Sequence, residues 1–138
     1  MRKSVFAIAF LAVTQVGAPP HGVVADAGAL DGYYTVSGTE SNGKKYNSVA
    51  TVMRRGDSYM VFWHMGEMST VGIGLRQSNT LSVGWTMAVE GKLVRGATQY
   101  KITNENGVPK LTGRWLSTAA PITSSETLTF MKALANDD

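Results

Sequence analysis

Residues 46–64 read YNSVATVMRRGDSYMVFWH, and this stretch decides the fold. On both sides of Arg55-Gly56, apolar residues recur at every second position, which is typical of half-buried β-strands. If Arg55-Gly56 is a two-residue hairpin loop, Val52 lies opposite Tyr59 and the apolar residues of both strands share one face. The stretch therefore predicts an antiparallel hairpin with one buried face.

The same alternation recurs along the rest of the chain, and no sustained helical period appears after residue 28. Short connections favour pairing between sequence neighbours, and eight such strands commonly close into a barrel that leaves no unpaired edge. We expect residues 28–138 to form one domain, an all-β, eight-stranded antiparallel up-and-down barrel that is calycin-like or avidin-like. The predicted strands are 32–39, 46–54, 57–64, 68–75, 79–86, 97–103, 109–116 and 125–132.

The turn at residues 77–79 decides which face of strand 68–75 is buried. A three-residue loop turns Val71, Ile73 and Leu75 inward, whereas a two-residue loop turns the two glycines of this strand inward. We expect the three-residue loop because it buries the larger side chains. The predicted interior is then Tyr34, Val36, Tyr46, Ala50, Val52, Tyr59, Val61, Trp63, Val71, Ile73, Leu75, Leu81, Val83, Trp85, Tyr100, Ile102, Leu111, Trp115, Leu128 and Phe130.

Residues 1–27 have the layout of a secretory signal peptide: a basic start at Arg2 and Lys3, an apolar run and a small-x-small site ending at Ala27. The apolar run is shorter than the about 20 residues of a membrane-spanning helix. We expect cleavage after Ala27, or alternatively after Ala18, and a secreted or periplasmic product. The chain contains no cysteine, so it has neither a disulfide nor an acylated-cysteine lipid anchor.

Composition and motifs argue against several functional classes. Thirteen basic and ten acidic residues are scattered without a basic stripe, so nucleic acid is not an expected partner. Apolar residues point inward, opposite to a membrane-embedded barrel. Of the two histidines, His21 lies in the predicted signal peptide and His64 has no clustered carboxylate nearby. We expect no metal, no cofactor and no catalytic residues, and therefore a protein that is not an enzyme.

The three tryptophans occupy equivalent positions in a short sequence pattern that occurs three times. Trp63, Trp85 and Trp115 each follow a large apolar residue by four positions, in the third, fifth and seventh predicted strands. Odd-numbered strands of a meander run parallel, so the indoles should gather inside one end of the barrel. Tyr46 and Glu126 begin even-numbered strands and should point inward at the same level. We expect this end to be open, with long loops at residues 39–45, 87–96 and 117–124.

Two interpretations of the tryptophan end remain. An eight-stranded barrel is just wide enough to be filled by side chains or to hold one small ligand. The indoles either plug the barrel or line a pocket for a small apolar or aromatic ligand. Glu126 is either an acceptor that orients this ligand or a partner of loop backbone. The candidate ligand-binding residues are Trp63, Trp85, Trp115, Tyr46 and Glu126.

A second candidate surface lies outside the barrel. Met60 and Phe62 should point outward from strand 57–64, and a contiguous exposed apolar surface often marks a partner site. This outer surface, which we call the wall, would then bind an extracellular protein or form a homodimer. Alternatively, Met60 and Phe62 are scattered surface residues without a binding function.

Several short motifs carry a resemblance to a known group of proteins. They are Asp31-Gly-Tyr-Tyr-Thr-Val-Ser-Gly-Thr39, Gly56-Asp-Ser-Tyr-Met-Val-Phe-Trp63, Val71-Gly-Ile-Gly74, Leu111-Thr-Gly-Arg-Trp115 and Ser125-Glu-Thr-Leu-Thr129. Over most of residues 31–132 the chain resembles a family of small secreted bacterial β-barrel proteins, sometimes labelled fibronectin-binding. In outline it also resembles the avidin and lipocalin barrels, although it lacks the Gly-x-Trp opening of lipocalins. The resemblance implies a small secreted barrel. From the tryptophan end we expect a secreted, non-enzymatic binding module with a small-ligand pocket at that end. The alternative is an adhesin-like, fibronectin-binding-like or inhibitor-like protein-binding module that acts through its loops or through the outer surface at Met60 and Phe62.

Overall fold

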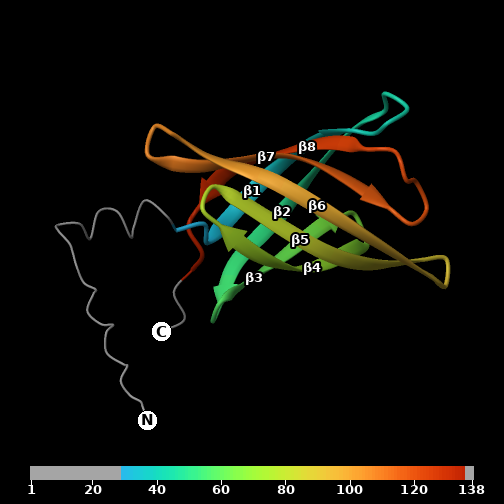
Figure 1. Cartoon of the computed structure of the whole chain (residues 1–138), viewed down its shortest axis with the longest axis horizontal. Helices are drawn as coiled ribbons and strands as arrows, with labels where there is room; N and C mark the ends of the chain where they lie inside the picture. The colour runs from blue at the N-terminus through green and yellow to red at the C-terminus, as the bar shows by residue number, and fades with distance from the viewer. Residues whose placement is uncertain (1–28, 136–138) are drawn as a thin grey trace, which may run out of the picture.

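The computed structural model describes residues 29–135, so the predicted signal peptide at residues 1–27 lies outside the described part. The described chain forms a closed barrel in which each strand pairs with its sequence neighbours and β8 returns to β1 (Figure 1). The strands are β1 Gly32–Thr39, β2 Lys45–Arg55, β3 Ser58–Met65, β4 Met68–Gln77, β5 Thr80–Val89, β6 Lys92–Glu105, β7 Val108–Ser117 and β8 Ser124–Lys132. The predicted antiparallel up-and-down barrel is confirmed.

The hairpin that connects β2 and β3 has a different register from the predicted one. Its loop is Gly56-Asp57 instead of Arg55-Gly56, and Val52 pairs with Val61 instead of Tyr59. Gly56 has a positive φ of 63°, which suits the first position of a tight hairpin loop and which glycine adopts without steric cost. The register shifts by two residues, so the predicted buried face of both strands is retained.

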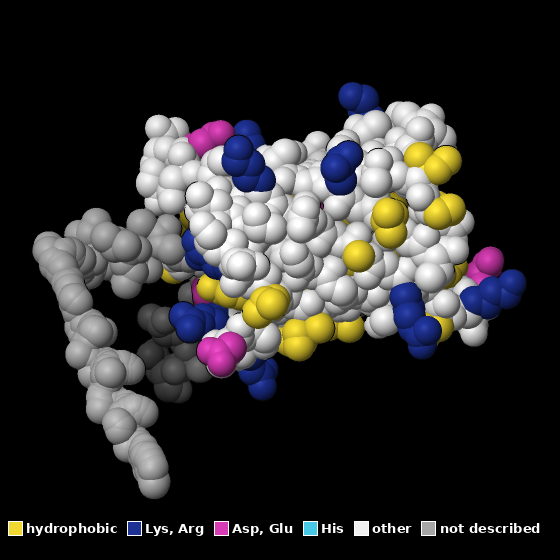
Figure 2. Space-filling view, viewed as in Figure 1, with side chains coloured by type: hydrophobic (Ala, Val, Ile, Leu, Met, Phe, Trp, Pro, Cys, Tyr) yellow, Lys and Arg dark blue, Asp and Glu magenta, His cyan; other side chains and the backbone are white. Residues whose placement is uncertain are grey.

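The predicted face of β4 is wrong. The loop between β4 and β5 is the two-residue Ser78-Asn79, not the three-residue loop at 77–79. Val71, Ile73 and Leu75 therefore point outward, with 40%, 61% and 65% of their surface exposed. Figure 2 shows hydrophobic side chains in a row along the lower edge of the barrel, where Figure 1 places this strand.

The inward positions of β4 are Thr70, Gly72 and Gly74. Other strands already fill the interior beside the two glycines. A Cβ on Gly72 would lie 2.6 Å from Val83 Cγ1 and 3.2 Å from the Trp63 ring. A Cβ on Gly74 would lie 3.1 Å from Leu81 Cδ1. Burying larger side chains from β4 was the wrong criterion, since core volume is shared among all the strands.

The hairpin of β5 and β6 is longer than predicted. The two strands continue through the expected loop at 87–96 and meet at Glu90-Gly91, where φ is 50° and 78°. Two positive φ values are the pattern of a type I′ turn. Glutamate is not a residue that signals such a turn, so the sequence did not reveal it. The extension brings Met87 and Val94 against the buried core.

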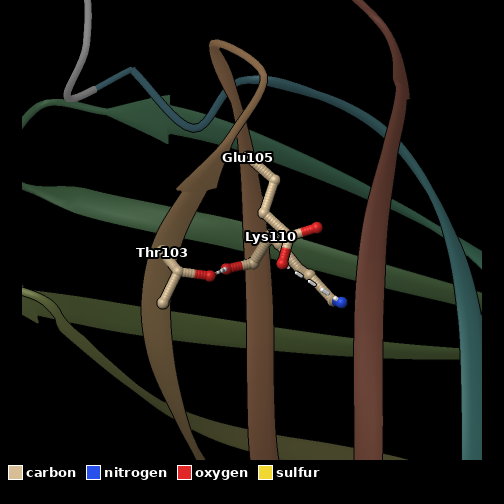
Figure 3. Close-up of polar contacts among 3 residues, drawn as sticks. All are labelled: Thr103, Glu105 and Lys110. Atoms are coloured by element: carbon tan, nitrogen blue, oxygen red, sulfur yellow. Dashed lines mark hydrogen bonds and ion pairs between the residues drawn. The ribbon is translucent and has the colours of Figure 1, made fainter.

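The end of the barrel opposite the tryptophans is closed by packing. Leu30, which precedes β1, is 1% exposed and belongs to the core, and Tyr34 donates a hydrogen bond of 2.7 Å to its carbonyl oxygen. The same end carries the β6–β7 hairpin, whose outer surface holds a 3.4 Å ion pair between Lys110 and Glu105 (Figure 3). This exposed pair contributes little stability, so closure rests on the apolar interior.

Candidate functional site

The tryptophan end is surrounded by loops that are tied to the barrel. The loops at residues 40–44 and 118–123 project at the right of Figure 1, together with the Glu90-Gly91 turn. The Ser41 amide donates to Ser124 Oγ at 3.0 Å, which joins the first loop to the start of β8. The Thr118 amide donates to the Arg95 carbonyl at 2.8 Å and fixes the second loop against β6. The rim of this end is therefore held by hydrogen bonds between separate elements.

A cavity of about 350 Å³ opens at this end of the barrel. All five predicted ligand-binding residues line it, so the structure brings together side chains from β2, β3, β5, β7 and β8. The indoles line this cavity and do not fill the end as a complete plug. The lining residues are Glu40, Tyr46, Trp63, Met65, Thr70, Trp85, Met87, Val89, Val94, Thr98, Trp115, Ser117, Ala119 and Glu126.

The indoles are fixed by hydrogen bonds and by contacts between rings. Trp85 Nε1 donates to Thr98 Oγ1 at 2.9 Å, and Trp115 Nε1 donates to Tyr46 Oη at 2.7 Å. The ring centroids of Trp85 and Trp115 lie 6.0 Å apart with an interplanar angle of 70°. Tyr46 and Trp115 are 6.4 Å apart at 71°. The rings of Tyr46, Trp85 and Trp115 are therefore inclined to one another instead of stacked, and all three residues line the cavity.

Glycines on neighbouring strands make room for two of these rings. Trp85 lies across Gly96, where a Cβ would fall 2.0 Å from the indole. Tyr46 lies across Gly38, where a Cβ would fall 2.1 Å from the phenol ring. Glycine in a strand interior often marks such a close approach. The cross-strand pairing that sets these ring positions was not visible in the sequence.

Glu126 is 7% exposed and lines the cavity. Its Oε1 accepts a hydrogen bond from Tyr46 at 2.9 Å, and its Oε2 accepts from Trp63 Nε1 at 3.1 Å. Tyr100 also donates its hydroxyl to Oε2. The carboxylate thus accepts from three side chains, and the alternative of a bond to loop backbone is wrong. Through Tyr46 the network extends to the Trp115 indole.

Burial controls the ionisation of this network. Loss of solvation raises the pKa of Glu126 above its usual value of 4.5, while the hydrogen bonds from Tyr100, Tyr46 and Trp63 act in the opposite direction. Burial, followed by the nearby Glu126 charge, also raises the pKa of Tyr46 and Tyr100. Both phenols therefore stay protonated and remain hydrogen-bond donors across the physiological pH range.

Several residues of the site were not among the predicted ligand-binding residues. Tyr100 was placed in the interior but not linked to Glu126, and Thr98 lies at an alternating position of the same predicted strand. Met87 and Val94 lie in residues 87–96, which the sequence predicts to be a loop. Glu40 lies in the loop after β1, and nothing in its local sequence indicates that it lines a cavity.

The outside of the barrel carries an apolar surface around Met60 and Phe62, with other neighbours than predicted. Met60 and Phe62 are half-buried on the outside of β3. They pair with Ile73 and Val71 of β4, which were expected to be buried. On the other side, Met60 lies beside Met53, not beside Thr51 as the predicted hairpin register implies. The correction of β4 therefore enlarges the apolar wall.

Three further features of the described residues concern histidine, metal-binding groups and membrane-spanning helices. His64 is exposed at the end of β3. Within residues 29–135, no group of three histidine, aspartate or glutamate side chains is arranged to hold a metal ion. No helix in that same range is both long enough and apolar enough to cross a membrane.

Comparisons with known proteins show similarity at the level of the fold. No protein-family model matches the chain, and no curated protein matches it. The chain is similar to a redesigned β-barrel, b11L5F_LGL, with a TM-score of 0.63 and 16% identity over 78% of this chain and 96% of that one. It is also similar to a redesigned β-barrel, mFAP1, whose structure is bound to DFHBI, with a TM-score of 0.57 and 16% identity over 75% and 97% of the two chains. At this identity the likeness shows the closed-barrel fold alone.

Proposed function

We propose that this protein is a secreted, non-enzymatic barrel that binds a small apolar or aromatic ligand at its tryptophan end. The observation that carries the proposal is the cavity of about 350 Å³ lined by Trp63, Trp85 and Trp115. Its size falls in the range of small-molecule sites, which are mostly apolar and carry a few placed polar groups. Glu126, Tyr46 and Thr98 supply those polar groups.

The comparison with mFAP1 supports the proposal at the level of the fold. That barrel holds DFHBI, so a closed barrel of this architecture leaves room for a bound compound. An eight-stranded barrel has an interior just large enough for one such molecule.

Tryptophan fluorescence offers a direct test, because all three tryptophans of the chain line the cavity. We expect the uncharged dye N-phenyl-1-naphthylamine to gain emission on binding and to quench the tryptophans. Val94→Phe fills the cavity and should abolish both changes. The matched control is Leu93→Phe, since Leu93 is the preceding residue, is 58% exposed and does not line the cavity.

Two results would contradict the proposal. Unchanged dye and tryptophan emission across a panel of apolar and aromatic compounds would show that the cavity takes no such ligand. Equal dye binding by the Val94→Phe and Leu93→Phe variants would place the dye elsewhere on the barrel.

Export is the second part of the proposal and is supported by the layout of residues 1–27. We expect the protein purified from the medium or periplasm of a bacterial host to begin at Gly28. N-terminal sequencing checks this. An intact Met1 in material retained inside the cell would contradict it.

A second candidate function is protein binding through the outer wall of β3 and β4. It is favoured by the register that places Met60 beside Ile73 and Phe62 beside Val71 on the outside of the barrel. Contiguous exposed apolar surface of this kind often marks a protein partner site or a homodimer.

The wall is tested by Phe62→Asp and Ile73→Asp. Both variants should abolish binding to immobilised fibronectin and any self-association seen by light scattering. Thr129→Asp, on the exposed face of β8, is the control. Retained association in both wall variants would contradict this function and leave the cavity proposal untouched.

A further inference from the structure

The wall of the cavity carries two acidic side chains. Glu40 and Glu126 line it, and no lysine, arginine or histidine lines it within the described residues. Lys44, Lys45 and Arg95 lie near the same end, but they are exposed and do not line the cavity. Charges in solvent are screened, whereas charges inside a cavity act more strongly on a bound molecule.

Among the residues that the structure describes, Glu126 receives hydrogen bonds from neutral donors only. Its hydrogen-bond partners are two phenols and one indole, from Tyr46, Tyr100 and Trp63. A buried carboxylate is costly unless a countercharge compensates it. Hydrogen bonds from neutral groups reduce this cost without supplying the countercharge. A bound cation would supply it and would stabilise the ionised carboxylate.

The aromatic rings of the cavity also favour a positively charged ligand. Tyr46 links Glu126 to Trp115 by hydrogen bonds, and Trp115 contacts Trp85 edge to face. Ammonium groups are attracted to the faces of indole and phenol rings, and clusters of inclined aromatic rings recognise quaternary ammonium ligands. Met87 and Val94 provide apolar contact for the remainder of such a molecule.

We infer that the cavity selects ligands in which an alkylammonium group is attached to an apolar or aromatic body, in preference to neutral or anionic molecules of the same shape. The inference rests on the proposed small-ligand function and adds the charge of the ligand. The ammonium group would lie between Glu126, Tyr46 and Trp115, with Glu40 at the rim adding to the negative potential. The apolar body would lie against Met87 and the neighbouring side chains.

The test uses three probes of similar shape. Benzyltrimethylammonium is the cation, neopentylbenzene is its uncharged isostere, and benzylsulfonate is the anion. Each is titrated against the purified protein loaded with N-phenyl-1-naphthylamine, with dye release and tryptophan quenching as readouts. We expect the cation to displace the dye at a concentration about tenfold or more below that of the neutral isostere, and the anion to be weakest.

Charge-neutral variants identify the groups responsible. Glu126→Gln should reduce the preference for the cation over its isostere to near unity, and Glu40→Gln should reduce it partly. Glu67→Gln is the control, since Glu67 is exposed in the β3–β4 turn at the same end and does not line the cavity. If Glu126→Gln does not fold, Glu40→Gln against Glu67→Gln still decides the question.

The outcomes separate the two proposals. If the dye binds but the isostere displaces it as well as the cation does, the inference is overturned and the small-ligand function stands. An unchanged preference in the Glu126→Gln and Glu40→Gln variants also overturns it. If neither dye nor any probe binds, the proposed function itself fails.

Discussion

The two ends of the barrel are built from the same eight strands but by different interior side chains. At the closed end, Leu30 and Leu111 are fully buried and Tyr34 gives its hydroxyl to a backbone carbonyl. At the open end, Tyr100 is equally buried but gives its hydroxyl to Glu126, beneath a cavity. The architecture is shared, so the choice of interior residues decides which end is filled by side chains and which end contains a cavity.

The largest expected difference between the ends concerns packing. Leu111→Ala should lower the free energy of unfolding by about 2–5 kcal/mol, because it leaves a void in a filled core. Met87→Ala should cost less than half as much, since Met87 is only partly buried and borders an existing cavity. Urea denaturation measures both. Equal losses would mean that the open end supports the fold as much as the closed end does.

Removing the central acceptor of the open end should have the next largest effect. Glu126→Ala leaves the donors of Tyr46, Trp63 and Tyr100 without their acceptor. An unsatisfied buried polar group costs about 1–3 kcal/mol. Glu67→Ala, at an exposed turn of the same end, should leave the urea midpoint unchanged. A stable Glu126→Ala variant would show that water replaces the carboxylate.

A smaller loss of stability is expected when Gly96, over which the Trp85 ring lies, is replaced. Gly96→Ala forces the Trp85 indole to move. We expect a loss of about 1–2 kcal/mol, in the lower part of the usual overpacking range, because the ring borders the cavity and has space to shift. The tryptophan emission maximum should shift as well. Gly84→Ala is the control, since its Cβ meets nothing within 4 Å and should change neither quantity.

We expect Glu126, at the open end, to make the stability of the protein depend on pH. The pKa of Glu126 is raised in the folded protein above its usual value of 4.5, so the folded state holds this proton more tightly than the unfolded state. Its contribution to stability is therefore complete below pH 4.5 and is lost as the pH rises through the folded pKa. Urea titrations should show stability falling over this window in the native protein and a flatter profile in Glu126→Gln. A parallel profile in the variant would contradict the assignment.

The smallest effect is expected on the outside of the closed end. Lys110→Ala removes the ion pair with Glu105, in which the two side chains are 35% and 58% exposed. Solvent screening limits such pairs, so stability should change by no more than about 0.5 kcal/mol. Thermal unfolding checks this. A larger loss would show that the hairpin surface contributes to closure.

The barrel and the five cavity residues could be predicted from the sequence, because the alternation of apolar and polar residues along a strand is a local property. This alternation also shows which side chains point inward. Trp63, Trp85 and Trp115 share an end as soon as the strands alternate in direction. The prediction failed at β4, where exposed Ile73 was expected to be buried, because both faces of that strand carry patterns compatible with burial. It also missed the pairing of Tyr100 with Glu126, which depends on the registers of two strand pairs.

The sequence by itself determined the all-β class, the number of strands and the end at which the tryptophans gather, since each follows from the period of two along a strand. Only the tertiary structure decided which face of β4 is buried, how far β5 and β6 extend, and that Glu126 meets three neutral donors beside a cavity. Register and interior volume are shared among strands distant in sequence, and no single segment specifies them.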